Sequence, residues 1–181
     1  MRIQPKAIDQ YPWYVRLLFK AQIKKYGEVF LSSQLWALSP RLFLAMSFFF
    51  GSLERKTSPI SPALRSLILV RISQVNVCSF CIDLNTSILL SRGVSMEKAM
   101  ALKDWSHSDD FTPAEKLVLE YVEAMTLSDR EVTDDLFQKL KTEFSEQEIL
   151  EITAIAAFQN MSTKFNSALD VPAQGFCTLP E

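Results

Sequence analysis

The stretch S-Q-V-N-V-C-S-F-C-I-D-L-N-T-S-I-L-L, residues 73–90, places two cysteines three positions apart in a mostly apolar run. These cysteines are Cys78 and Cys81. Residues three apart share one face of a helix, so the two sulfurs can approach disulfide distance if the run is helical. The pair is therefore a redox pair, half of a metal site, or two small core residues.

Each interpretation makes a different demand on the rest of the chain. Free cysteine packs as a small hydrophobe, so a purely structural role demands nothing more. A zinc site needs about four ligands, and the chain adds only Cys177 and the single His107, at no recognisable spacing. Thiol chemistry needs only a helix start, whose N–H groups and dipole favour a thiolate that attacks a peroxide or a disulfide. The pattern favours thiol chemistry, with no metal and no other cofactor expected.

The remaining sequence predicts an all-α fold. Ser61 followed by Pro62 is a helix start, and Thr112–Glu115 and Ser145–Glu148 read as capping boxes. Gly93 is a natural helix end. The sequence shows no Asn-Gly hairpin signal and no sustained alternation of apolar and polar residues. We expect helices at residues 13–26, 41–53, 62–76, 78–93, 95–105, 113–127, from 133 onward, and 146–169.

Length, charge and hydropathy exclude several protein classes. A chain of 181 residues is expected to be one compact unit with a real core, and its net charge of −2 argues against nucleic-acid binding. The most apolar window, residues 42–53, is too short to span a bilayer and is expected to be a buried helix. No secretory signal is evident. We therefore expect a cytoplasmic protein without an integral membrane segment, in which a structural disulfide framework is not expected.

The charge distribution suggests a division within that unit. Residues 1–25 carry six Lys or Arg against the single Asp9, whereas residues 104–151 are strongly acidic. We expect residues 1–40 to be an N-terminal amphipathic helical extension and residues 41–181 to be the main helical domain. The aromatic and aliphatic residues of the extension fit a subunit contact, and the Phe-rich window at 43–50 fits a core or an oligomer interface.

The run L-R-S-L-I-L-V-R-I-S-Q-V-N-V-C-S-F-C, residues 64–81, resembles the core of the carboxymuconolactone decarboxylase/AhpD-like alkyl hydroperoxidase family. In that family an apolar helix ends in Ser-x-x-Asn-x-Cys-x-x-Cys. The resemblance continues through residues 91–102 and 119–126 and covers most of residues 40–175. It implies an AhpD-like helical domain with the C-x-x-C at a helix N-terminus, assembled as a homo-trimer or hexamer.

The same resemblance implies an activity. Peroxidase members of the family reduce hydroperoxides, so Cys81 would react with the peroxide, Cys78 would resolve the product, and an unidentified thiol protein would be the reductant. Two relay positions depart from the pattern: Asn85 stands where the relay histidine is expected and Ser66 where the relay glutamate is expected. An amide can orient a hydrogen bond but does not titrate.

Several residues are candidates to replace the proton relay. Besides Asn85 itself, Glu120 and Glu123 are spaced to share one face of the helix that Thr112 opens, with Glu120 the better fit to a solvated face. Asp83 would point roughly away from the cysteine face unless Cys78 precedes the helix proper. His107 is expected on a surface loop, and Cys177 is expected to be a single packed or exposed thiol.

Three functions therefore stand as hypotheses. The first is a thiol–disulfide oxidoreductase with peroxidase-type activity. The second is a decarboxylase like the family's namesake, which would use carboxylate and histidine chemistry, of which this chain supplies little. The third is a non-catalytic helical oligomer whose cysteines sense redox state or simply pack.

Overall fold

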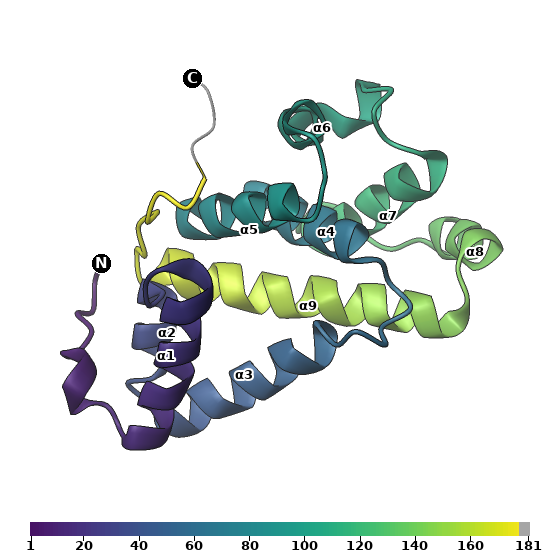
Figure 1. The fold of residues 1–181 in the computed structure, drawn as a ribbon. Helices are drawn as coiled ribbons and strands as arrows, with labels where there is room; N and C mark the ends of the chain where they lie inside the picture. Colours follow the sequence, from purple (N-terminus) through teal and green to yellow (C-terminus); the bar gives the residue numbers. More distant parts are fainter. Residues whose placement is uncertain (178–181) are drawn as a thin grey trace.

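The computed structural model describes residues 1–177, which form nine α-helices and two short 3-10 helices without a strand among them (Figure 1). The predicted all-α fold is confirmed. The helices are α1 (Trp13–Tyr26), α2 (Leu31–Trp36), α3 (Pro40–Leu53), α4 (Pro62–Val75), α5 (Ser79–Ser91), α6 (Met96–Ala101), α7 (Pro113–Ala124), α8 (Asp134–Glu143) and α9 (Glu146–Ala168), with 3-10 turns η1 (Ile8–Gln10) and η2 (Leu102–His107).

The predicted helix starts form as their side chains dictate. The Ser61 hydroxyl accepts a hydrogen bond from the backbone N–H of Leu64 at 3.2 Å, and the boxes that begin at Thr112 and Ser145 are both complete. Each such cap satisfies a backbone donor that the helix leaves unpaired. Gly93 ends α5 with a φ of 83°, the left-handed conformation that favours glycine. Local chemistry therefore sets most of the helix boundaries.

The long helix α9 is the centre of the molecule (Figure 1). Helices α4 and α5 lie on one side of it and α3 on the other, while α7 and α8 pack at its N-terminal half. The largest core cluster fills the space between α4, α7, α8 and α9. Its fully buried members are Ile68, Ile72, Val118, Val122, Leu140, Ile152 and Ala156. Burial of such side chains, at about 1.5–3 kcal/mol for each of the larger ones, holds α4 and α9 in register.

Both ends of the described chain meet near the start of α5. The backbone N–H of Arg2 donates to the carbonyl of Leu169 at 2.9 Å, and the indole ring of Trp36 stacks on Phe165 of α9 at 3.8 Å between centroids. In Figure 1 the C-terminal segment after α9 rises beside the first turn of α5. The beginning of α5 is therefore covered by segments that are remote in sequence.

The expectation of a buried helix at residues 42–53 is wrong. In α3 only Phe43 and Leu53 are buried, because one side of the helix packs inward and the other faces outward. Phe48 is 79% exposed, and Trp13 on α1 is 67% exposed. Within residues 1–177, no helix combines the length and apolar character that crossing a membrane requires.

Candidate functional site

The cysteine pair lies at the N-terminus of α5, as predicted. Cys78 is the N-cap residue, and its sulfur accepts a hydrogen bond from the backbone N–H of Cys81 at 3.3 Å. The two sulfurs form a disulfide, with the Cα atoms 5.2 Å apart, a separation well suited to such a bond. Val77 precedes the pair with a φ of 51°, which is unusual for a β-branched residue. This turn lets the N–H of Cys78 donate to the carbonyl of Ser73 at 3.0 Å.

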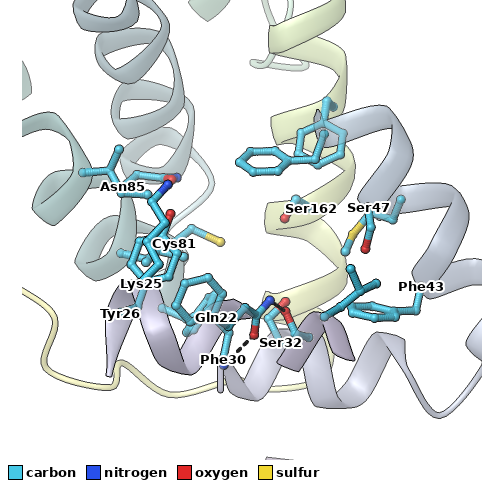
Figure 2. A pocket seen from close by; sticks show the side chains of 18 of the residues that line it. Gln22, Lys25, Tyr26, Phe30, Ser32, Phe43, Ser47, Cys81, Asn85 and Ser162 are labelled. Carbon is cyan, nitrogen blue, oxygen red and sulfur yellow. Dashed lines mark hydrogen bonds between the residues drawn. The ribbon is translucent and has the colours of Figure 1, made fainter. Parts of the chain in front are cut away.

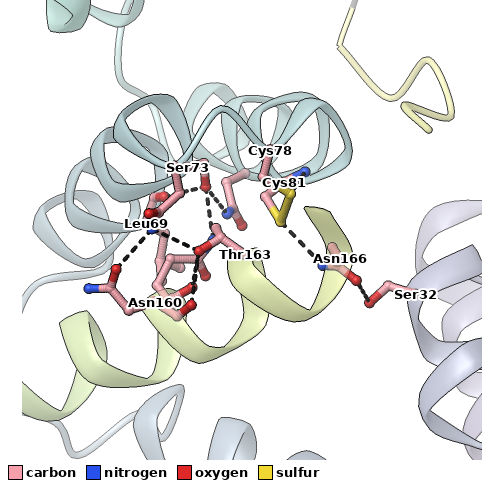
Figure 3. The surroundings of a disulfide bond; sticks show 11 residues. Ser32, Leu69, Ser73, Cys78, Cys81, Asn160, Thr163 and Asn166 are labelled. Atoms are coloured by element: carbon pink, nitrogen blue, oxygen red, sulfur yellow. Dashed lines mark hydrogen bonds between the residues drawn. A yellow bond between two sulfur atoms is a disulfide. The ribbon is translucent and has the colours of Figure 1, made fainter. Parts of the chain in front are cut away.

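A second helix supplies a hydrogen-bond donor to the Cys81 sulfur (Figure 3). The side-chain amide of Asn166, on α9, donates to Sγ of Cys81 at 3.2 Å. Its carbonyl oxygen accepts a hydrogen bond from the Ser32 hydroxyl of α2 at 2.7 Å. All three residues are buried. A donor aimed at a sulfur stabilises its thiolate over its thiol, so this chain of contacts favours a reactive Cys81 in the reduced protein.

Cys81 lines a cavity of about 340 Å³ (Figure 2). Its sulfur points into the space between α5 and the walls that α1, α3 and α9 supply. The walls are mainly aromatic and aliphatic, including Phe30, Phe43, Phe50, Phe80, Phe158, Leu18, Leu84, Ile88 and Met46. Cys78 is not among the lining residues. A small molecule in the cavity would therefore meet Cys81 first.

Asn85 also lines this cavity, but hydrogen bonds hold its side chain toward α4. Its amide donates to the Ser73 hydroxyl at 3.1 Å, and the amide of Gln159 donates to the same oxygen at 2.8 Å. The Ser73 hydroxyl in turn donates to the carbonyl of Leu69 at 2.6 Å. This buried network joins α4, α5 and α9 beside the cysteine pair. Asn85 is thus positioned near the cavity without a titrating group.

The position of the missing relay glutamate lies elsewhere. Ser66 is fully buried on α4, two turns before Ser73. Its hydroxyl accepts a hydrogen bond from the Arg92 guanidinium at 2.8 Å. It is not among the residues that line the cavity of Cys81. Position 66 therefore lies outside that cavity, and position 85 contributes an amide to it in place of an ionisable group.

The two glutamates of α7 have different environments. Glu120 is exposed, as expected of a solvated position, whereas Glu123 is 5% exposed. The carboxylate of Glu123 accepts hydrogen bonds from Arg71, from the indole N–H of Trp105 at 2.6 Å and from Arg130 at 3.0 Å. These partners come from α4, from η2 and from the loop after α7. Neither glutamate lines the cavity of Cys81.

Asp83 is turned toward the C-terminal segment. Cys78 does precede the helix proper, the condition under which Asp83 could have faced the cysteines. Its carboxylate instead accepts three backbone N–H bonds, from Gln174 and Gly175 at 2.8 Å and from Cys177 at 2.7 Å. Asp83 therefore anchors the segment that follows α9.

The two remaining candidates lie apart from the disulfide chemistry. The His107 side chain is 81% exposed and contacts the exposed Asp104 at 2.7 Å, as a surface residue should. Cys177 is a free, partly buried thiol, and burial, together with the negative charge of Asp83, raises its pKa. Within residues 1–177 no cluster of three or more His, Cys, Asp or Glu side chains is placed to hold a metal ion.

Sequence reasoning missed the most direct partner of Cys81. Asn166 lies in F-N-S-A-L-D-V, a segment that resembles the family only weakly. Its neighbours Lys164 and Ser167 are also polar, so its amide does not stand out in the sequence. Ser32 gave no signal, because α2 was not predicted.

The comparisons with known proteins agree with this architecture. Residues 41–124 match the sequence model of the carboxymuconolactone decarboxylase family. The chain is 42% identical over 158 residues to the uncharacterized protein YnjA of Escherichia coli strain K12, an alignment that spans 87% of each chain.

Two solved structures show the same fold at low sequence identity. One is an uncharacterized peroxidase-related protein from Ralstonia eutropha JMP134 with an alkylhydroperoxidase AhpD core (TM-score 0.88, 21% identity, 97% of this chain and 93% of that chain). The other is the debrominase Bmp8 in its apo form (TM-score 0.85, 22% identity, 96% of this chain and 92% of that chain). The predicted AhpD-like fold is thereby confirmed.

Proposed function

This chain belongs to the carboxymuconolactone decarboxylase/AhpD-like family, and we propose that it is a thiol–disulfide oxidoreductase that reduces hydroperoxides through Cys78 and Cys81. The observation that carries the proposal is the placement of the Cys81 sulfur. It faces an apolar cavity on one side and lies within bonding distance of the Cys78 sulfur on the other. A substrate and a resolving thiol can therefore reach the same atom.

The first step oxidises Cys81. Its thiolate attacks the terminal oxygen of a hydroperoxide, so that an S–O bond forms and the O–O bond breaks. The alkoxide leaves with the bonding electron pair and takes a proton to become the alcohol, while Cys81 becomes a sulfenic acid. Asn166 donates to the sulfur, which stabilises the thiolate that begins this step.

The second step forms the disulfide. The Cys78 thiolate attacks the Cys81 sulfur, the S–O bond breaks, and hydroxide leaves and takes a proton to become water. The hydrogen bond from the Cys81 backbone N–H and the N-terminal end of α5 favour the thiolate form of Cys78. A dithiol reductant then attacks the disulfide, returns two electrons and is itself oxidised to a disulfide. We take that reductant to be a cytoplasmic thiol protein.

Proton delivery to the leaving alkoxide falls to water or to a polar group at the cavity. Among the relay candidates, only Asn85 lines the cavity, and it can orient a water molecule without titrating. We expect an enzyme of this kind to depend less sharply on pH near neutrality than one whose relay contains a histidine.

The exposed surfaces of α1 and α3 support self-association. Trp13, Leu17, Leu42 and Phe48 are more than half exposed, and apolar side chains gathered on neighbouring helices are typical of protein contact surfaces. We propose a homo-oligomer, a trimer or a hexamer, that buries these faces.

Peroxide consumption with dithiothreitol tests the function. The wild type should consume cumene hydroperoxide catalytically, Cys81→Ser should lose the activity, and Cys78→Ser should accumulate a sulfenic acid that dimedone traps. Equal rates for the wild type and Cys81→Ser would refute the proposal.

Two further outcomes would favour the other hypotheses. Turnover of a lactone acid by the Cys78→Ser/Cys81→Ser double variant would indicate a decarboxylase. Slow alkylation of both reduced cysteines, at a rate typical of an unactivated thiol, would indicate the non-catalytic oligomer.

A further inference from the structure

The cavity of Cys81 contains a single positive charge in an otherwise uncharged lining. Of its lining residues in the described chain, Lys25 is the one Lys, Arg, Asp, Glu or His. The polar side chains that accompany it are amides and hydroxyls, such as Gln22, Ser47 and Ser162. The electrostatic character of the cavity therefore depends mainly on Lys25.

Lys25 stands at the mouth of the cavity in the last turn of α1. Its side chain is exposed, and its Nζ atom lies 4.8 Å from the ring centroid of Tyr26, which also lines the cavity. Within residues 1–177 it makes no ion pair. The acidic residue nearest in sequence, Glu28, accepts a hydrogen bond from Gln174. Lys25 is therefore available to an anion.

The opposite walls of the cavity suit an apolar group. Phe43, Met46 and Phe50 of α3 and Phe158 of α9 offer an aromatic and thioether surface, which excludes a highly charged or strongly hydrated ligand. A volume of about 340 Å³ is at the small end of ligand pockets, which span roughly 300–1,000 Å³. The lining thus combines one cationic edge, a small apolar interior and a reactive sulfur.

We propose that the cavity selects an apolar monoanion, with a carboxylate beside Lys25 and a medium-length aliphatic or aromatic body against α3 and α9. As a refinement that rests on the proposed function, the substrate class is the hydroperoxide of such a carboxylic acid, with its O–O bond placed at Cys81. Hydrogen peroxide, which contacts neither the cation nor the apolar walls, is then a poor substrate.

Binding can be tested without any chemistry at the cysteines. Calorimetry with the oxidised, disulfide-bonded protein compares decanoate with 1-decanol, which has the same chain length and no charge. We expect decanoate to bind about 5-fold more tightly, since a partly exposed charge pair contributes up to about 1 kcal/mol. Lys25→Met should abolish the difference. Lys24→Met should preserve it, because Lys24 is an equally exposed neighbour that does not line the cavity.

Equal binding of the two ligands by the wild type, no binding of either, or selectivity that survives in Lys25→Met would each overturn the inference. The substrate form of the test compares kcat/KM for a fatty acid hydroperoxide and for its methyl ester, in the wild type and in Lys25→Met. Selective binding without peroxide reduction would refute the proposed function and support the anion site. Peroxide reduction with unselective binding would refute the anion site and support the proposed function.

Discussion

The side-chain amide of Asn166 and the sulfur of Cys81 are joined by a 3.2 Å hydrogen bond, although 85 positions separate them in the chain. Asn166 is 1% exposed and Cys81 is 3% exposed. The Ser32 hydroxyl donates to the other end of the same amide and thereby fixes its orientation. The amide N–H is thus committed to the sulfur, and water has little access to replace it.

Asn166→Ala should therefore slow the reaction of Cys81. Loss of the donor removes a stabilising contact from the thiolate, so we expect alkylation of the reduced Cys81 near neutral pH to slow several-fold. The measurement is the pH dependence of iodoacetamide labelling, followed by mass spectrometry of each cysteine.

Asn160→Ala is the matched control. Asn160 also lies on α9 and makes partly buried amide contacts with Asn76 and Thr126, but it is six residues, about 9 Å, from Asn166 along the helix. The Asn160→Ala variant should lose a comparable amount of stability, while Cys81 should be alkylated at the wild-type rate. An equal change of the Cys81 alkylation rate in both variants would mean that Asn166 acts only through general packing.

The contrast between Thr112 and Asn166 shows how far sequence can predict this molecule. A capping box is complete within four residues, so Thr112 and Glu115 predict the start of α7, which the structure confirms. The contact of Asn166 forms only after α9 has packed against α5, and an amide in a helix has no periodicity that reveals its partner. The environment of Glu123 is of the same kind, because its partners come from three separate segments.

Glu123→Gln should destabilise the fold more than it affects catalysis. The buried carboxylate accepts from two guanidinium groups and one indole, and its replacement leaves Arg71, which is mostly buried, without its counter-charge. A loss of about 3 kcal/mol in the free energy of unfolding is expected, by analogy with other broken buried pairs. Urea denaturation monitored by circular dichroism measures it.

The same variant tests Glu123 as a relay group. Because Glu123 does not line the cavity, peroxide reduction by the folded variant should remain within about twofold of the wild type, an effect of less than about 0.5 kcal/mol on the barrier. A variant that folds with little loss of stability yet fails to react with peroxide would instead establish Glu123 as part of the relay.

Phe48→Ser should weaken self-association. Phe48 is 79% exposed on α3, so its replacement should change the folding stability of the isolated chain little. An oligomer that buries this ring would lose an aromatic anchor at the subunit contact. Light scattering coupled to size exclusion should show smaller assemblies for this variant. Leu150→Ser, at a 68% exposed position on α9, should keep the wild-type mass. A wild type that is monomeric at tens of micromolar would contradict the proposed oligomer directly.

Asp83→Asn should loosen the C-terminal segment that lies beside the disulfide. The carboxylate accepts three N–H bonds on its two oxygens, and an amide can accept on only one of its two atoms. In the wild type, burial and the charge of Asp83 raise the pKa of Cys177, so little thiolate forms near neutral pH, and the labelling rate should still be rising with pH where that of an ordinary free thiol has levelled off. In Asp83→Asn both causes weaken, the pKa falls, and labelling of Cys177 at pH 8 should be several-fold faster.

Asp109→Asn, an exposed loop position, supplies the control and should label at the wild-type rate. The released segment should also let a dithiol reach Cys78, since Val171 and Phe176 pack in the same cluster as the cysteine pair. Reduction of the disulfide by dithiothreitol should therefore be faster in Asp83→Asn than in Asp109→Asn. Unchanged rates for both Cys177 labelling and disulfide reduction would mean that the contacts of Val171 and Phe176 hold the segment without Asp83.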